Sequence, residues 1–456
     1  MDTHRRQLLS LARPVYVELL ASVAAGIINT VWVARLGGPA VAAVAVATNT
    51  ENVLLGVSLV FGSGTTVLVA HARGARDPGA VRAAVRGGWA VWALLTPVVA
   101  VGGFLLREPL ARAVLGDASS ALPLAVGYFA ISLPGIAVFY AQNLVDGILK
   151  GTGDTRTPMR LALLANGLIL VCDPWLIQRH GVQGAAVSTV LCRCVALAVG
   201  LSVLRRAALL RQARSARPAE GVGPALRRTL RTGLPMAADF TVRQGGALAL
   251  VAIVARIGVT AVAAYAVAYK ALYVATMAFY AVRQAAAIHT AQLLGAGRRA
   301  SAGPGTAESG TGAGGGERWA VGRAAVLLSG TVGALAAALL ALTAPWIMAA
   351  FGAGPEVAAA GVLFLRCVGP YLLLMACFIA LGGVFEGSGG APLLLRVTLL
   401  GTAVQLPLAL ALSGLGLPGV CLALALAMAV QCAAVALLLR RGHRREAAPG
   451  RPARVG

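Results

Sequence analysis

The chain has 456 residues, of which 58% are hydrophobic and only 12% charged, and its mean hydropathy is +0.81. Charged residues make up about a quarter of an ordinary soluble domain, so this composition excludes a protein whose whole surface faces water. In a soluble protein the net charge of +23 would favour nucleic acid as a partner. The composition instead predicts a membrane protein, and its many cations need a separate explanation.

Apolar windows of about 20 residues, the length of a membrane-spanning helix, predict twelve transmembrane helices. In the first half they lie at approximately 14–34, 52–71, 87–106, 122–148, 158–178 and 184–204. In the second half they lie at approximately 235–255, 261–290, 322–349, 357–384, 392–413 and 416–439.

The breaks between these windows predict the domain organisation. It consists of an N-terminal segment 1–12, a first six-helix lobe 13–204, a basic linker 205–231, a second six-helix lobe 232–439 and a basic tail 440–456. A Gly-rich segment at about 299–316 has the composition of a linker, so we expect a disordered insertion there.

The positions of the cations support this count. Of the 39 Lys and Arg residues, 29 fall on the side that holds both termini, five on the opposite side and five within spans. Because cationic loops stay cytoplasmic, this asymmetry predicts a multi-pass protein of the inner (cytoplasmic) membrane with both termini in the cytoplasm. The net charge is then a topology signal that faces anionic lipid, and no nucleic acid partner is expected.

An internal repeat relates the two halves. Residues 33–47 recur at 254–268 with 11 of 15 positions identical, at an offset of 221 residues. Three glycines, at 147, 151 and 153, match those at 383, 387 and 389 at an offset of 236. Because six spans separate the repeats, both halves have the same orientation. The repeat predicts an all-α integral membrane protein with two pseudo-symmetric six-helix lobes around a central cavity, as in alternating-access transporters.

Neither the cysteines nor any enzyme motif in the sequence indicates catalytic or metal-binding chemistry. The seven cysteines lie in apolar stretches without a CxxC pair or a zinc-ligand spacing. No nucleophile elbow or phosphate loop is present. We therefore expect no enzyme activity, no metal site and no cofactor.

Motifs along nearly the whole chain resemble one transporter family. Residues 147–177 combine a Gly-rich turn, the sequence GDTRTP and a helix with Asp-Pro, and residues 27–37, 62–77, 231–240 and 286–298 add further motifs in order. Together they resemble the multidrug and toxic compound extrusion (MATE) family, and within it the bacterial DinF-like branch. In the GDTRTP turn, Lys150, Asp154, Arg156 and Arg160 are expected to cap a cytoplasmic connection rather than to bind a ligand.

Ionisable groups inside spans are candidates for cation coupling because they are costly in lipid. Asp173 lies in the middle of a span, and the resemblance assigns its position to the cation-coupling site of the first lobe. Asn166, seven residues earlier, lies on nearly the same helix face. The structural alternative is that Asp173 satisfies backbone groups freed at Pro174.

Two positions depart from the family pattern. Asn29 stands where the resemblance places a cation-binding Asp, and an amide can neither lose a proton nor supply a full charge. Ile169 stands where the family usually has Asn. Either coupling runs through other carboxylates, or it is altered or lost in this chain.

Glu18 is the natural substitute, since it precedes Asn29 by about three helical turns on the same face. Its repeat counterpart Asp239 is expected to form an ion pair with Arg243 at i+4. Both acids could equally stabilise helix entry without moving ions.

The remaining candidates would line a substrate cavity. They are Asp239, Arg243, Gln244, Lys270, Tyr273, Arg283 and Tyr140. The cations among them suggest a basic interior in the second lobe that suits an anionic or zwitterionic substrate. Arg193 and Arg366 lie within spans and have no evident partner in the sequence.

The expected function is efflux of amphipathic organic compounds by cation antiport, with H+ favoured over Na+. Glu18, Asn29, Asn166 and Asp173 are the expected coupling residues, and the partners are a small-molecule substrate, the cation and the lipid bilayer. We expect a monomer. The alternatives are a flippase for lipid-linked precursors of the same superfamily and a non-transporting membrane scaffold or sensor.

Overall fold

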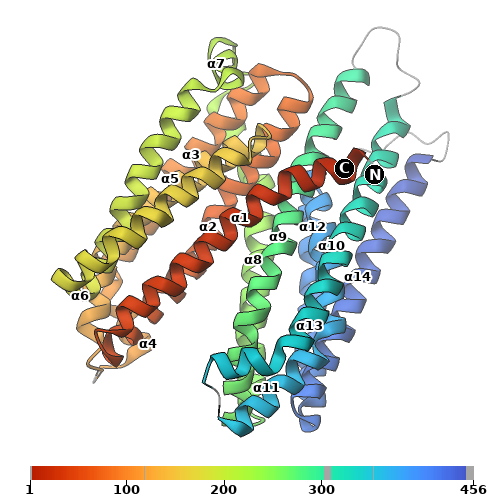
Figure 1. Cartoon of the computed structure of the whole chain (residues 1–456). Helices are drawn as coiled ribbons and strands as arrows, with labels where there is room; N and C mark the ends of the chain where they lie inside the picture. Colours follow the sequence, from red (N-terminus) through yellow and green to blue (C-terminus); the bar gives the residue numbers. More distant parts are fainter. Residues whose placement is uncertain (1–2, 118, 302–309, 353, 448–456) are drawn as a thin grey trace. The chain divides into compact units, whose positions relative to one another are not determined.

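The computed structural model describes residues 3–117, 119–301, 310–352 and 354–447, and its regular structure there is helical (Figure 1). The first half contains α1 Thr3–Ala34, α2 Gly38–Gly74, α3 Pro78–Leu105, α4 Arg107–Leu115, α5 Leu122–Gly151, α6 Arg156–Arg206 and α7 Ala208–Ser215. The second half contains α8 Val222–Ala255, α9 Val259–Ser301, α10 Gly310–Ala350, α11 Pro355–Cys367, α12 Gly369–Gly387, α13 Ala391–Leu412, the short 3-10 helix η1 Ser413–Leu415 and α14 Leu417–Ala447.

The predicted count of twelve spans is confirmed. Within the described residues, 11 helices are long and apolar enough to cross a membrane. One of them, α6, has 51 residues, about twice the length that one crossing needs. Its helical geometry breaks at Gly181, where φ is 58° and ψ is −137°. The two arms of α6 on either side of Gly181 are the predicted fifth and sixth spans.

Two predicted elements differ in detail from the structure. The span predicted at 357–384 is interrupted, because α11 ends at Cys367 and α12 begins at Gly369, next to Pro370. The insertion predicted to be disordered at 299–316 has helical ends, since α9 continues to Ser301 and α10 begins at Gly310. Residues 302–309 of that insertion lie outside the described residues.

The helices pack into two compact units. The first unit comprises Pro14–Arg73 and Asp77–Ala237, and the second comprises Met1–Arg13, Gly74–Arg76 and Ala238–Gly456. In the first unit, α5 packs against α3 and both arms of α6, around buried aromatic residues such as Phe61, Phe129 and Tyr140. In the second unit, α12 lies against α9, α10 and α14 around Phe279, Phe364 and Phe378.

The sequence repeat is also a structural repeat. In the first unit, α5 crosses α2 so closely that a Cβ on Gly147 would lie 2.6 Å from the carbonyl oxygen of Gly62. In the second unit, Gly383 of α12 packs on the carbonyl oxygen of Arg283 in the same way. Gly62 and Arg283 are related by the offset of 221, and Gly147 and Gly383 by the offset of 236. The turns that follow also match, with φ of 80° at Gly153 and 79° at Gly389.

These glycine contacts give a first prediction. Gly147→Ala should destabilise the chain by about 1–3 kcal/mol, because the new methyl group meets backbone atoms of α2 that cannot rotate away. Gly167→Ala is the matched control, since nothing lies within 4 Å of the added Cβ and helix propensity favours alanine. Thermal unfolding of both variants in detergent is the measurement. Equal melting temperatures would show that the α2–α5 contact can relax.

Candidate functional site

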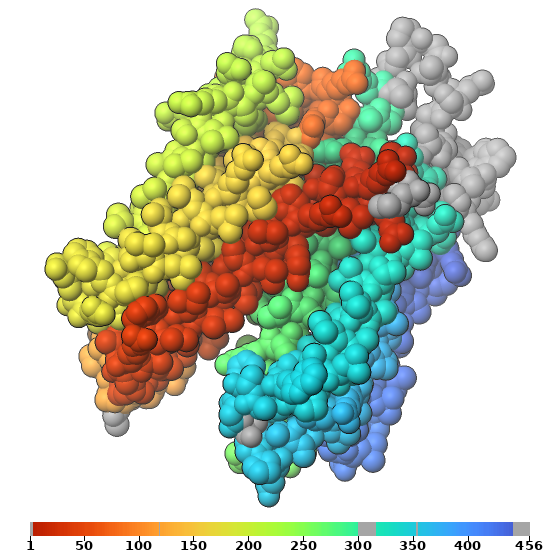
Figure 2. All heavy atoms as spheres, viewed as in Figure 1, coloured from red at the N-terminus to blue at the C-terminus, as the bar shows by residue number. Residues whose placement is uncertain are grey.

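The structure brings Asn29 and Asp173 together inside the first unit. Nδ2 of Asn29 in α1 donates a hydrogen bond of 2.7 Å to Oδ2 of Asp173 in the first arm of α6. Asp173 is fully buried, and its other oxygen, Oδ1, has no hydrogen-bond partner among the described residues. The side-by-side packing of α1 (red) and α6 (yellow) is visible in Figure 2. The pair has one titratable carboxylate, held by a neutral donor.

Asn166 does not bind Asp173 in this structure. Its Nδ2 lies 3.4 Å from Oγ of Ser22 in α1, so it forms a second, weaker polar link between the same two helices. The residue that pairs with Asp173 is therefore Asn29. Helical spacing on α6 alone could not identify this partner, because it comes from another helix.

Glu18 forms a second polar site with two residues of α5. Its Oε1 accepts a hydrogen bond of 2.8 Å from Nζ of Lys150, and the two side chains are only 13% and 11% exposed. Asp146, one turn before Lys150, is also buried and lies within electrostatic range of both. We call Glu18, Asp146 and Lys150 the Glu18 cluster. Lys150 was expected to cap a loop, and this ion pair corrects that expectation.

The sequence reasoning missed two ionisable residues of the first unit, Glu51 and Asp146. Glu51 of α2 and Asp146 of α5 both lie within electrostatic range of Arg193, in the second arm of α6. The guanidinium of Arg193 also stacks 4.3 Å above the ring centroid of Phe139. Asp146 lies inside the predicted span 122–148, so the cost of burying its charge was the available signal. Glu51 lies one residue before a predicted span and gave no such signal.

The second unit holds a network of four charged side chains, Asp239, Arg243, Arg283 and Glu386, which we call the Asp239 network. Oδ2 of Asp239 is 2.9 Å from Arg243 and 3.0 Å from Arg283. Arg283 also makes a bidentate contact with Glu386, at 2.6 and 3.1 Å. Thr398 of α13 donates to the other oxygen of Asp239 at 2.6 Å. The expected ion pair between Asp239 and Arg243 is confirmed.

This network is charge-balanced, with two carboxylates and two guanidinium groups. Along the sequence, Asp239 is the one acid close to these two arginines, and this pattern suggested a basic interior. Glu386 lies about 100 residues further on, and folding brings it to Arg283. The two arginines therefore do not by themselves make the interior basic, and the suggestion of an anionic or zwitterionic substrate stays a prediction.

The other predicted cavity residues are spread over different environments. Tyr140 is fully buried, and its hydroxyl donates to the carbonyl of Leu54 at 2.7 Å, as expected for a core residue. The side chains of Gln244, Lys270 and Tyr273 are exposed. Nζ of Lys270 lies 5.7 Å from the ring centroid of Phe351. Arg366 is exposed at the end of α11. None of these side chains joins the Asp239 network by a hydrogen bond that the described residues show.

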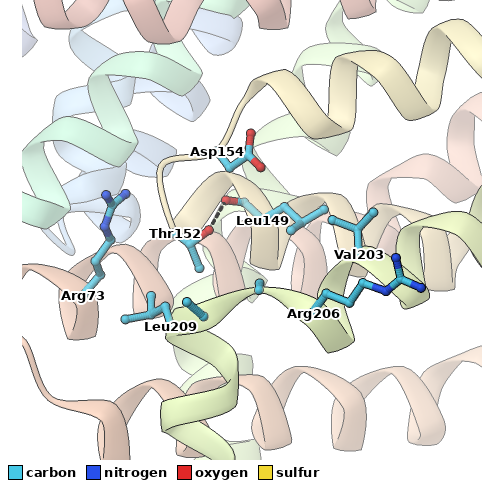
Figure 3. A pocket seen from close by; sticks show the side chains of 9 residues that line it. Arg73, Leu149, Thr152, Asp154, Val203, Arg206 and Leu209 are labelled. Atoms are coloured by element: carbon cyan, nitrogen blue, oxygen red, sulfur yellow. Dashed lines mark hydrogen bonds between the residues drawn. The ribbon is translucent and has the colours of Figure 1, made fainter.

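A cavity of about 500 Å³ lies in the first unit, where α5 and α6 end and α7 begins. Figure 3 shows Arg73 of α2, Arg206 of α6 and Asp154 of the turn around it. Asp154 caps α6, since its carboxylate accepts from the backbone N–H groups of Arg156 and Thr157 at 3.1 and 3.0 Å. The predicted capping role of Asp154 is confirmed, and the lining includes none of the residues predicted to bind substrate.

The fold and these buried ionisable pairs define a class, that of multi-pass membrane transporters built from two repeated helical units. Among solved structures, the crystal structure of MATE in complex with MaL6 has a TM-score of 0.85 and 20% identity to this chain, covering 98% of this chain and 97% of that one. At this identity the likeness concerns the fold.

The MatE family model matches residues 14–175 and 319–411, and the chain belongs to the MatE family. Among curated relatives, the probable multidrug resistance protein YpnP of Bacillus subtilis is 26% identical over 252 residues, 55% of this chain and 56% of the relative. The DNA damage-inducible protein F of Escherichia coli is 28% identical over 45% of each chain. The chain thus spans about half the length of the curated relatives it matches. MATE transporters are not enzymes.

The Asp239 network gives a second prediction. Arg283→Met should destabilise the chain by about 3–5 kcal/mol, because two buried carboxylates lose the cation between them. Adding Glu386→Gln should restore part of the loss, since it removes the carboxylate that is left without a cation, whereas Asp239 keeps its pair with Arg243. Arg366→Met, an exposed position in the same unit, should change little. Thermal unfolding and the yield of monodisperse protein in detergent would measure this. An unaltered Arg283→Met variant would contradict the pairing.

Proposed function

We propose that the chain is a secondary efflux transporter, which exports amphipathic organic compounds in exchange for a cation. The buried Asn29–Asp173 hydrogen bond is the observation that carries the proposal. It places a carboxylate inside the first unit, at a position where a change of protonation alters the contact between α1 and α6. A cation that binds Asp173 can therefore act on helix packing within the unit.

Protons suit this pair better than sodium ions. Sodium requires several oxygen ligands, whereas Asn29 turns its NH2 group, a donor, towards the carboxylate. Protonation of Asp173 needs no additional ligands, and it removes the charge that accepts the Asn29 hydrogen bond. A protonated carboxyl group can both donate and accept hydrogen bonds, so the neutral Asn29–Asp173 pair can change its hydrogen-bond arrangement. This argument favours H+ as the coupling ion.

The orientation follows from the distribution of cations. The side with 29 of 39 Lys and Arg residues is proposed to face the cytoplasm, which places both termini there and the protein in the inner membrane. The turn between α5 and α6, with Asp154 and the nearby arginines, then lies on the cytoplasmic side. Export thus moves the substrate away from this turn. We propose a monomer as the transporting unit.

Asp173→Asn gives a third prediction. In inverted vesicles energised by a pH gradient, this variant should reduce transport of a fluorescent amphipathic dye at least about tenfold, an effect of about 1.4 kcal/mol or more. The reason is that the amide cannot bind the coupling proton. Asp77→Asn is the matched control, because Asp77 is an exposed N-cap of α3 and asparagine caps a helix equally well. Dye transport by Asp173→Asn at the wild-type rate would refute a coupling role for Asp173.

A second substitution separates altered from lost coupling. Asn29→Asp restores the carboxylate that the family resemblance expects, and it should change the pH dependence of transport because two adjacent carboxyl groups share a proton. A chain without coupling would show no gradient dependence before or after this substitution. The same assay would therefore exclude the scaffold or sensor alternative if the wild-type chain transports the dye.

A further inference from the structure

The two structural repeats allow one unit to serve as a reference for the other. By the offsets of 221 and 236 residues, Glu18 corresponds to Asp239, Gly62 to Arg283, and Lys150 to Glu386. The close contacts of Gly147 on Gly62 and of Gly383 on Arg283 show that these correspondences hold in three dimensions. Each repeat therefore has an acidic cluster at the same place within its own unit.

The charges of these two clusters differ. In the second unit, the carboxylates of Asp239 and Glu386 are compensated by Arg283 and Arg243. In the first unit, Gly62 stands at the position of Arg283 and provides no cation. Asp146 corresponds to Gly382 in the second repeat. The guanidinium of Arg283 lies over Gly382. The first unit therefore has a carboxylate where the second unit has a cation.

The Glu18 cluster consequently contains two carboxylates and one ammonium group. Lys150 binds Oε1 of Glu18 at 2.8 Å, whereas Oε2 of Glu18 and Oδ1 of Asp146 are buried without a hydrogen-bond partner in the part of the chain that is described. The charged groups that act on Asp146 are Glu18 of α1, Lys150 of α5 and Arg193 of α6. Two neighbouring buried carboxyl groups with one free oxygen each are the usual arrangement of a pair that holds one proton.

We propose that Glu18 and Asp146 form a proton-binding site in the first unit, separate from the Asn29–Asp173 pair. One proton binds between the two carboxyl groups, and Lys150 keeps the remaining negative charge in place. Release of that proton leaves two carboxylates opposite one ammonium group. The site restores the carboxylate pair that Asn29 removes at the other site.

Other ionisable groups of the first unit lie near each of these two sites. Tyr128 of α5 lies within electrostatic range of Asp173, Glu51 and Arg193, and Arg193 in turn lies within range of Asp146. Tyr128 and Asp146 are 18 residues apart on α5, which corresponds to about 27 Å along the helix. The ionisable groups of the first unit therefore extend over most of a membrane thickness.

Proton counting on the purified full-length chain in detergent tests the Glu18–Asp146 site. The number of protons released between about pH 5 and about pH 9 is measured by titration for the wild type and for Asp146→Asn. The expected result is one proton fewer per chain for Asp146→Asn, because the shared proton has lost one of its two carboxyl groups. Asp77→Asn is the control, since it removes an exposed carboxyl group outside the cluster and should leave the count unchanged.

A second variant keeps the test decisive if Asp146→Asn does not fold. Asp146→Gly copies the second repeat at this position and should also lower the count by one. Infrared difference spectra should lose one protonated-carboxyl band in the same variants. An unchanged count and an unchanged band in a folded variant would overturn the proposal.

The role in transport rests on the proposed function, but proton binding does not. If the count falls as expected while dye transport is absent in the wild type, the site stands and the efflux proposal fails. If the wild type transports dye while Asp146→Asn binds as many protons as the wild type, the efflux proposal stands and this site fails. The two proposals are therefore tested by separate measurements.

Discussion

The burial of charge in a medium of low dielectric constant is the constraint on which the polar interior of this protein depends. An isolated carboxylate inside a helical bundle has a large desolvation cost, so it must be paired, hydrogen-bonded or protonated. Three acids of the described residues use the first two solutions. Asp239 and Glu386 are paired with arginines, and Asp173 accepts a bond from Asn29. In the Glu18 cluster two carboxylates face the Lys150 ammonium group, Arg193 is shared between Asp146 and Glu51, and the proposed proton supplies the remaining positive charge.

The helices themselves follow from patterns that a sequence displays locally. Apolar windows, turn glycines and the asymmetry of cations predicted twelve spans, and even the two arms of α6 were separated because Gly181 lies between two windows. The break between α11 and α12 was missed, because Val368 and Gly369 are apolar residues that do not interrupt a hydropathy window. Composition cannot distinguish a continuous span from two helices that meet inside it.

The polar sites were predictable only as single residues. Hydropathy identifies Asp173, Glu18 and Arg283 as costly, but it says nothing about partners that lie on other helices. The distances in sequence are 144 residues for Asn29 and Asp173 and 103 residues for Arg283 and Glu386. The pair Asp239–Arg243 was predictable, because its members are one turn apart on one helix. Where partners come from distant elements, only the folded chain reveals whether a charge is balanced.

Comparison of the repeats also suggests how the two halves have specialised. A duplicated unit begins with identical sites, and a few substitutions suffice to give one copy fixed ion pairs and leave the other with groups that exchange protons. Gly62 and Arg283 occupy one such position, and Lys150 and Glu386 occupy another. The charge-balanced network ties α8, α9, α12 and α13 together. The Glu18–Lys150 ion pair joins α1 and α5.

The glycine crossing of α2 and α5 has a practical consequence. Where two backbones touch without side chains between them, the distance between the helices cannot be adjusted by a rotamer change, so backbone contact sets the separation at this crossing. A pair of spectroscopic labels on the two helices near Gly62 and Gly147 would therefore report a constant separation through a transport cycle. Such a pair is an internal length standard, against which motions elsewhere in the protein can be calibrated.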